Sequence, residues 1–77
     1  MLRTRVKICG ITRTEDADAV VTSGADALGL VFFPESPRYV AIEQARAIAG
    51  SVAPLVTIVG LFVNPSPDTV NAVLDTI

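Results

Sequence analysis

The stretch Ala27-Leu28-Gly29-Leu30-Val31-Phe32-Phe33 decides the fold class of this chain. It contains no polar or charged side chain, whereas a strand with one face in water alternates apolar and polar residues. An unbroken apolar run of this length is typical of a strand that is covered on both faces, as strands are in parallel sheets. The sequence therefore predicts a strand over residues 27–33 within a parallel sheet.

Similar apolar runs lie before and after this stretch, at residues 5–11 and 55–63, and a helical pattern follows each of the three runs. The apolar positions of the predicted helices recur every three or four residues, and they are Ala17, Val20 and Val21; Ile42, Ala45, Ile48 and Ala49; and Val70, Val73, Leu74 and Ile77. Strands that alternate with helices indicate βαβ units. Three consecutive units begin either an eight-unit barrel or an open doubly wound sheet, and the periodicity alone does not choose between them.

Short motifs mark the ends of the predicted helices. Thr12 and Glu15 have the spacing of a capping box, in which each side chain bonds to a free backbone N–H at the start of a helix. Gly24 and Gly50 are placed to end the first and second helices. Ser66 is predicted to cap the third helix, because a serine hydroxyl accepts a hydrogen bond from the first turn.

The composition excludes several classes of function. The chain has 77 residues, of which 51% are hydrophobic and 18% charged, and its formal net charge is -2. We therefore expect no nucleic acid and no membrane as a partner, since both would call for a basic surface. With no histidine to complete a typical metal cluster, we expect no metal site, and we also expect no cofactor. One cysteine, and no segment that reads as a signal peptide or membrane span, predict a cytoplasmic protein.

Cys9 is the leading candidate for chemistry. It lies at the end of the first predicted strand, and the carboxyl ends of parallel strands are where α/β folds gather their reacting groups. Strand alternation places Lys7 on the same face, roughly 6.5 Å away along the strand, where an ammonium group favours a thiolate. Two structural alternatives stay open, because a free cysteine is more often a small buried hydrophobe and a strand lysine can simply extend its amine to water.

Several segments of the chain, in this order and spacing, resemble the phosphoribosylanthranilate isomerase family from about Val6 to the last residue. They are Lys7-Ile8-Cys9-Gly10-Ile11-Thr12, Glu15-Asp16-Ala17, Ser23-Gly24-Ala25-Asp26-Ala27-Leu28-Gly29, Phe32-Phe33-Pro34-Glu35-Ser36-Pro37-Arg38-Tyr39 and Val59-Gly60-Leu61-Phe62-Val63-Asn64. The resemblance implies an α/β fold made of the first three βα units of a (β/α)8 TIM barrel, with parallel strands. Residues 1–77 would then be the N-terminal part of a single barrel domain that is incomplete as given.

The resemblance also implies a function, the Amadori rearrangement of N-(5-phosphoribosyl)anthranilate in tryptophan biosynthesis. It assigns Cys9 as the general base and Arg38 as the group that holds the anthranilate carboxylate, and we add Lys7 as a substrate-binding candidate. The expected partner is therefore a small phosphorylated sugar-anthranilate. The general acid of the family, an aspartate later in the barrel, and its phosphate-binding loops match nothing here, so we expect the isolated chain to be inactive.

Two other classes of function stay open. A non-catalytic barrel fragment would expose a strand edge and an inner face, and it would associate with the missing remainder of the barrel or with itself. A small thiol-based redox protein is disfavoured, because the chain has no second cysteine for a CxxC pair.

Overall fold

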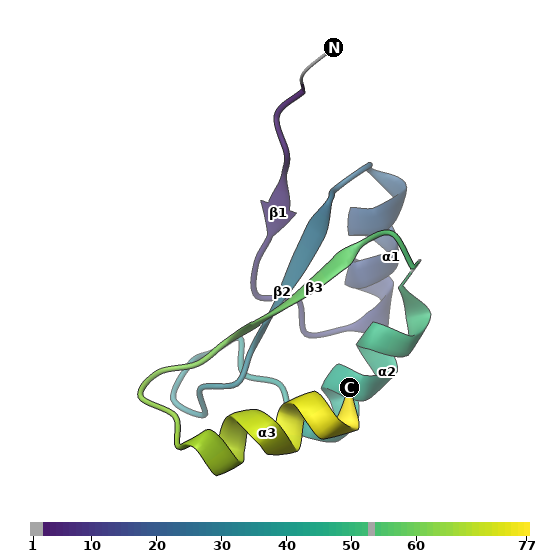
Figure 1. Cartoon of the computed structure of the whole chain (residues 1–77). Coiled ribbons are helices and arrows are strands. Elements are labelled where there is room, and N and C mark those ends of the chain that lie inside the picture. Colours follow the sequence, from purple (N-terminus) through teal and green to yellow (C-terminus); the bar gives the residue numbers. More distant parts are fainter. Residues whose placement is uncertain (1–2, 53) are drawn as a thin grey trace.

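A computed structural model describes residues 3–52 and 54–77, in which strands and helices alternate along the chain (Figure 1). The elements are β1 (Lys7–Ile8), α1 (Thr14–Thr22), β2 (Ala27–Val31), α2 (Ile42–Ser51), β3 (Thr57–Leu61) and α3 (Pro67–Thr76). The strands form one sheet in the order β1-β2-β3, and both pairs are parallel. The predicted fold, a parallel sheet built from three βα units, is confirmed.

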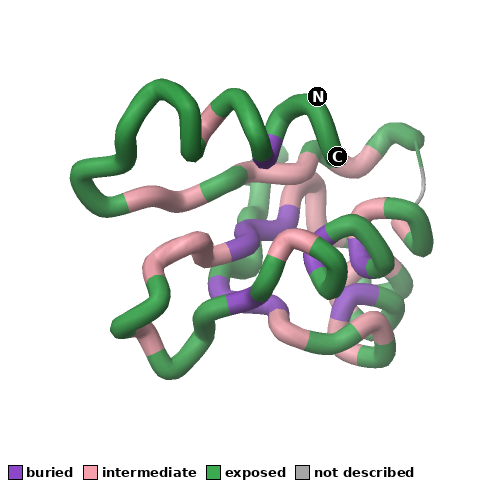
Figure 2. Tube along the Cα trace, turned by 90° about the horizontal axis from the view of Figure 1, so that it is seen from below, coloured by how far each residue is buried: buried purple, intermediate pink, exposed green. Residues whose placement is uncertain are grey.

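The hydrophobic core lies on one face of the sheet, which we call the outer face. Leu28 and Leu30 of β2 are fully buried there, together with Ala17 of α1 and with Ala45 and Ile48 of α2. Both helices lie on the same side of the sheet in Figure 1, and the buried residues gather at the centre of the molecule in Figure 2. The unbroken apolar run thus has Leu28 and Leu30 in this core, with Phe32 partly buried against it.

The opposite face of the sheet, the inner face, carries the alternate residues of each strand. Gly29 lies on this face, because a methyl group added to it would come within 3.1 Å of Cys9 Sγ and 3.0 Å of Leu61 Cδ1. Its neighbours Ala27 and Val31 on β2 are only half-buried. In a complete (β/α)8 barrel the inner face lines the interior and is filled by layers of side chains.

The third helix is well capped but poorly covered. Ser66 accepts a hydrogen bond from the backbone N–H of Thr69 at 3.1 Å, and Pro67 begins the helix, so the predicted cap is confirmed. Along the apolar stripe of α3 only Val73 is buried, whereas Leu74 is 68% exposed. Figure 2 shows most of this helix in the colour of exposed residues. None of the described helices is long and apolar enough to cross a membrane.

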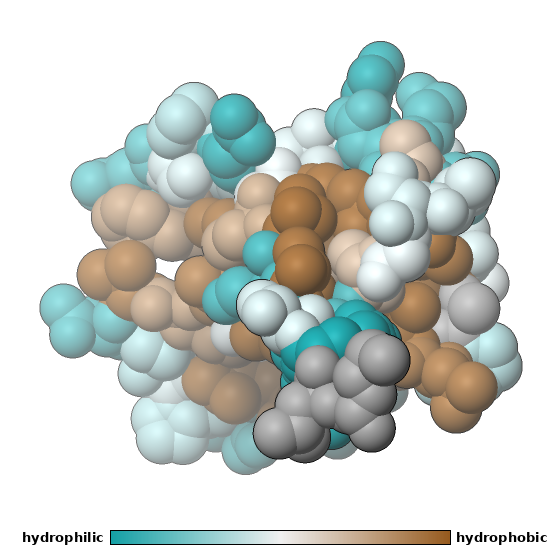
Figure 3. Space-filling view, turned by 90° about the horizontal axis from the view of Figure 1, so that it is seen from above, coloured by the Kyte–Doolittle hydropathy of each residue, from teal (hydrophilic) through white to brown (hydrophobic). Residues whose placement is uncertain are grey.

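Apolar surface is also uncovered where the strands begin. Figure 3 looks onto this end of the sheet, and brown apolar side chains are visible across the middle of the face. Val6, Ile8 and Leu55 are all exposed, Leu55 to 96% of its surface. A compact domain of this size rarely leaves so many large apolar residues in water without a partner surface.

The start of α1 differs from the prediction. The capping box is wrong: Arg13 precedes the helix, it makes no side-chain cap, and the hydroxyl of Thr14 donates to Glu15 instead. The carbonyl of Thr12 accepts from the side chain of Gln44 at 3.2 Å, so a contact with α2 fixes the entry to the helix. The other end is as predicted, with Gly24 at a φ of +90° directly after the helix.

The second helix and the strands have different bounds from those predicted. Gly50 does not end α2, which continues to Ser51 with Gly50 inside its last turn. All three strands are shorter than their apolar runs. The first is shortest because the backbone N–H groups of Gly10 and Ile11 both donate to the carbonyl of Gly29, at 3.0 and 3.2 Å, which interrupts the regular ladder after Ile8.

Candidate active site

Cys9 lies at the carboxyl end of β1, next to the middle of β2. The register pairs Lys7 with Ala27 and Ile8 with Leu28, so the next pair along the strands is Cys9 and Gly29. The chain turns immediately after this point, where two successive amides share the Gly29 carbonyl. Cys9 is exposed, and its thiol is accessible from the inner face.

Arg38 comes to the same edge from the loop that follows β2. This loop folds back on its own strand, since the backbone N–H of Val40 donates to the carbonyl of Val31 at 3.0 Å. Inside the loop, the hydroxyl of Ser36 accepts from the backbone N–H of Arg38 at 3.1 Å. The guanidinium Nη1 of Arg38 then donates to the carbonyl of Gly10 at 3.4 Å. The structure therefore brings Arg38 against the residue that follows Cys9.

Gly10 makes this approach possible in two ways. Its φ of +80° lies in the left-handed region, which side chains other than that of glycine rarely adopt. A methyl group at this position would also lie 3.2 Å from both Cγ and Nη1 of Arg38. The sequence prediction did not assign a role to Gly10 or to Ser36; the signal for Gly10 was its place directly after the strand-terminal cysteine.

The guanidinium of Arg38 has donors to spare. It is exposed, and within residues 3–52 and 54–77 it forms no ion pair. The long bond to Gly10 uses a single N–H group. A planar guanidinium in this state can give two parallel, charge-assisted hydrogen bonds to a carboxylate.

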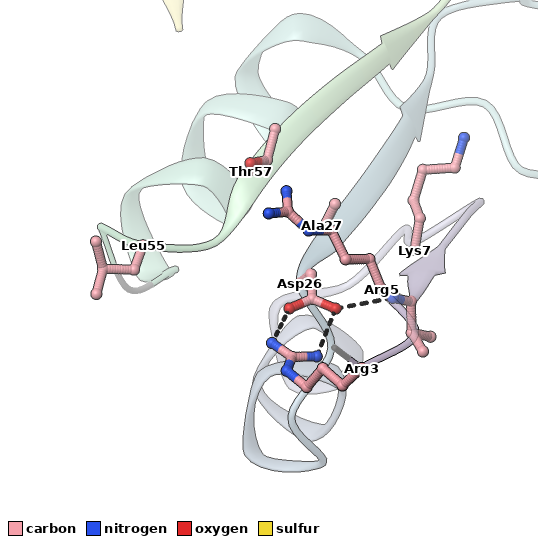
Figure 4. A pocket seen from close by; sticks show the side chains of 8 residues that line it. Arg3, Arg5, Lys7, Asp26, Ala27, Leu55 and Thr57 are labelled. Carbon is pink, nitrogen blue, oxygen red and sulfur yellow. Dashed lines mark hydrogen bonds and ion pairs between the residues drawn. The ribbon is translucent and has the colours of Figure 1, made fainter. Parts of the chain in front are cut away.

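Lys7 lies nearer the opposite end of the strands, on the same face as Cys9. It lines a pocket of about 590 Å³ together with Arg3, Arg5 and Asp26 (Figure 4). In this view Lys7 points away from Asp26, whereas Arg3 points toward it. The structure thus brings Cys9 and Arg38 together at the carboxyl edge and places Lys7 at the pocket where the strands begin.

Asp26 ties the N-terminal segment to the start of β2. Arg3 donates to both carboxylate oxygens, and the backbone N–H of Val6 donates to Oδ2 at 2.8 Å. These hydrogen bonds stabilise the ionised form and lower the pKa of Asp26 to about 2. The ion pair between Asp26 and Arg3 is therefore a structural contact near Lys7, and it lies away from the end of the sheet where Cys9 and Arg38 meet.

A second hollow flanks the loop of Arg38. It has a volume of about 350 Å³ and lies between the segments that follow β2 and β3, with Phe33, Tyr39 and Asn64 among its lining residues. Its walls are largely apolar side chains, and Asn64 turns there with a φ of 45°. Within the described part of the chain, no three His, Cys, Asp or Glu side chains are grouped so as to hold a metal ion.

Comparison with known proteins gives a consistent set of relatives. The family model for N-(5'phosphoribosyl)anthranilate (PRA) isomerase matches residues 6–77. The N-(5'-phosphoribosyl)anthranilate isomerase of Acinetobacter calcoaceticus is 57% identical over 74 residues, which are 96% of this chain and 35% of that protein. That of Ralstonia pickettii is 59% identical over 73 residues, or 95% of this chain and 31% of that protein. The chain thus spans about a third of the length of the curated relatives it matches.

Solved structures agree with these relatives. The phosphoribosyl anthranilate isomerase of Thermotoga maritima superimposes with a TM-score of 0.93 at 50% identity, over 96% of this chain and 36% of that one. The same TM-score and identity hold for a phosphoribosyl anthranilate isomerase in complex with reduced 1-(o-carboxyphenylamino)-1-deoxyribulose 5-phosphate, over 96% of this chain and 38% of that one. With a matching fold and a family model that covers nearly all of its residues, the chain belongs to the N-(5'-phosphoribosyl)anthranilate isomerase family.

Proposed function

We propose that residues 1–77 contribute the N-terminal three βα units of a single (β/α)8 barrel that isomerises N-(5-phosphoribosyl)anthranilate. The product is 1-(2-carboxyphenylamino)-1-deoxyribulose phosphate, in a step of tryptophan biosynthesis. Membership of the family supports this activity, and so does the relative that was solved with a reduced form of such a product. The observation that carries the proposal is the meeting of Arg38 with Gly10, the neighbour of Cys9, at the carboxyl edge of the sheet.

Cys9 is the general base in this proposal. The ribose ring first opens to a Schiff base, and the thiolate of Cys9 then takes the proton from C2 of the sugar. The electron pair of the broken C–H bond forms the C1–C2 double bond of an enolamine, and the former imine electrons move to nitrogen. Tautomerisation of the enolamine gives the aminoketose. A positioned base of this kind contributes about 10²- to 10⁴-fold to a rate, and the exposed thiol on the inner face is open to a substrate.

Arg38 holds the anthranilate carboxylate. Its unpaired fork of N–H groups suits two parallel bonds to a carboxylate, and Gly10 fixes its stem beside the turn that follows Cys9. When Arg38 binds the anthranilate carboxylate at this point, the sugar carbons of the same substrate would lie over the thiol of Cys9. Lys7 lies on the same face as Cys9 and stays a substrate-binding candidate in this proposal, although its side chain lines the pocket where the strands begin.

The remaining catalytic parts are placed outside these residues. Protonation of the ribose ring oxygen needs a general acid, and the phosphate needs a binding loop, and neither has a counterpart in residues 1–77. In (β/α)8 barrels such loops follow the last strands. We therefore assign both to the rest of the barrel, and we expect the isolated chain to have no isomerase activity.

A second role, as a non-catalytic assembly partner, is supported by the uncovered surface. Leu55, Leu74 and Val63 are exposed to 96%, 68% and 54%, and α1 and α2 pack against the outer face of the sheet. Such a surface favours association with the remaining strands or with another copy of the chain. In this role the chain would complete a barrel, but Cys9 would take no proton.

The test compares the chain with a completed barrel, which we define as residues 1–77 joined to the portion of the Acinetobacter calcoaceticus relative beyond its match to this chain. Conversion of phosphoribosylanthranilate is followed by the loss of substrate fluorescence. We expect turnover by the completed barrel, none by the isolated chain, and recovery when the chain is co-expressed with the same portion of the relative. Turnover by the monomeric 77-residue chain would show that the division of the active site proposed here is wrong.

A further inference from the structure

The side chain of Cys9 lies close to the backbone of Gly29 on the inner face. A methyl group added at Gly29 would lie 3.1 Å from Cys9 Sγ, 3.3 Å from Cys9 Cα and 3.0 Å from Leu61 Cδ1. Carbon atoms in favourable contact are about 3.5 to 4.0 Å apart, so all three distances are too short. A side chain at position 29 would therefore require these neighbours, the thiol of Cys9 included, to shift by a few tenths of an ångström.

The three atoms that a methyl group at Gly29 would approach differ in how easily they can move. Leu61 Cδ1 is the end of a side chain that can rotate, and Cys9 Sγ can change its rotamer. Cys9 Cα is backbone, and it is held by the parallel register and by the shared Gly29 carbonyl. A methyl group at Gly29 would therefore move the thiol before it moves the strand.

We propose that Gly29 is a positioning residue for the Cys9 thiol, an inference that rests on the proposed function of Cys9 as the base. Gly29 touches no substrate; its lack of a side chain fixes where the sulfur stands on the inner face. A methyl group at Gly29 would force Sγ to move by a few tenths of an ångström or to change rotamer, and a misplacement of about 1 Å of a reacting group can lower a rate by about 10²-fold. The identity of residue 29 is thus coupled to catalysis through the position of Sγ.

Gly60 supplies a matched control. It belongs to the near-copies Gly29-Leu30-Val31-Phe32 and Gly60-Leu61-Phe62-Val63, but the register pairs it with Leu30, so it lies one position further along its strand than Gly29 and on the outer face. A methyl group at Gly60 would meet ring atoms of Phe62 at 3.1 Å and of Phe32 at 3.5 Å, and no atom of Cys9. The same substitution at the two positions therefore separates the effect of a strand glycine from the effect on Cys9.

The first experiment measures kinetics in the completed barrel. We expect Gly29→Ala to lower kcat by about 10- to 100-fold with KM within about twofold, because the Arg38 side of the site is unchanged. Gly60→Ala should keep kcat within about twofold of the unmodified barrel. Equal kcat values for Gly29→Ala and the unmodified barrel would overturn the proposal.

A double variant separates Cys9 from Leu61. Gly29→Ala with Leu61→Ala removes the 3.0 Å contact but keeps the one with Sγ, so we expect its kcat to stay well below that of Leu61→Ala alone. The double variant also serves if Gly29→Ala alone fails to fold. Recovery of kcat to the level of Leu61→Ala alone would show that Gly29 accommodates Leu61, which contradicts a role toward Cys9.

The second experiment does not depend on isomerase activity. Cys9 is the single cysteine of the 77-residue chain, so its rate of alkylation by iodoacetamide reports this thiol alone. With an unchanged far-UV circular dichroism spectrum, we expect Gly29→Ala to change that rate by at least about threefold and Gly60→Ala to leave it unchanged. Equal rates for all three proteins would refute the positioning role. If Gly29→Ala changes the alkylation rate of the chain but Cys9→Ala leaves the kcat of the completed barrel unchanged, only the assignment of Cys9 as the base is refuted.

Discussion

The second and third βα units share a nearly repeated strand segment but are held in place differently. In the second unit helices cover the outer face of β2, and Ala45 and Ile48 of α2 are fully buried, yet Ala41, which precedes this helix, gives it no side-chain cap. In the third unit Ser66 caps α3, yet only Val73 of that helix is buried. Burial stabilises the second unit and local hydrogen bonding helps to hold the third.

The two strands also use their glycines differently. The register pairs Leu30 with Gly60 and Gly29 with Val59, so the near-copies are offset by one residue and their glycines face opposite sides of the sheet. Gly29 faces Cys9, and Gly60 lies beneath the stacked rings of Phe32 and Phe62, whose centroids are 5.3 Å apart. A repeat in sequence therefore does not imply a repeat in role.

The largest change in the free energy of unfolding is expected from a pair of substitutions at one buried and one exposed leucine, one in each unit. Leu30→Ala removes a fully buried side chain from the second unit and should lower the free energy of unfolding of the chain by about 2 to 5 kcal/mol. Leu74→Ala, at an exposed position of the third unit, should change it by less than about 0.5 kcal/mol. Urea unfolding followed by circular dichroism measures both. Equal losses would remove the distinction between the units.

The next largest effect is expected on catalysis, at Arg38 in the loop that follows β2. In the completed barrel, Arg38→Ala should lower kcat/KM by an amount equivalent to about 1.5 to 3 kcal/mol, the range for hydrogen bonds to a charged group. Arg38→Lys should recover only part of it, because an ammonium group cannot give two parallel bonds. Arg46→Ala, on the exposed surface of α2, is the control in steady-state kinetics. An unchanged KM and kcat/KM in Arg38→Ala would exclude the carboxylate role.

Substitutions at the N-caps of α2 and α3 should change the free energy of unfolding in opposite directions. Ser66→Ala removes the bond to Thr69 and should cost about 1 kcal/mol of unfolding free energy. Ala41→Ser gives the second unit the cap it lacks and should add about 0.5 kcal/mol or more. Thermal unfolding of the two variants beside the unmodified chain checks both signs. A gain from Ser66→Ala would contradict the contribution assigned to the cap.

The smallest effect is expected at low pH, through Asp26 at the start of the second unit. Its pKa falls from 3.8 to about 2 on folding, so its contribution to stability is fully present above about pH 4 and is lost as the pH falls toward 2. Asp26→Asn should remove this part of the acid unfolding curve. Asp18→Asn, which changes an exposed carboxylate of α1, is the control. If both variants follow the unmodified chain between pH 4 and 2, the pair with Arg3 does not stabilise the fold.

Patterns that depend on neighbouring residues were predictable from the sequence. The unbroken run over 27–33 predicted a parallel strand covered on both faces, and the structure confirms a parallel strand over Ala27–Val31 whose outer face packs against the described helices. Ser66 and Gly24 predicted a helix start and a helix end that the structure confirms. Each of these signals acts through contacts within a few residues or through burial along one strand. The place of Cys9 and Arg38 at the same edge followed from the rule that parallel strands end together.

Features that depend on contacts distant in sequence were not predictable. The capping box at Thr12 failed because the entry to α1 is fixed by Gln44 of α2 and by the turn at Gly10. The close approach of Gly29 to Cys9 required the register between β1 and β2, which no local pattern specifies. The sequence likewise placed Lys7 beside Cys9 but could not show the pocket it lines.

The central claim is that Cys9 takes a proton from the substrate, and replacing its thiol tests this most directly. In the completed barrel, kcat for phosphoribosylanthranilate conversion is measured for Cys9→Ala and Cys9→Ser, with the thermal midpoint of each variant as the control for folding. We predict a loss in kcat of at least about 10²-fold with a nearly unchanged midpoint, because the exposed thiol contributes little to the core. A Cys9→Ala barrel that keeps the unmodified kcat would show that the chain completes the fold without supplying the base.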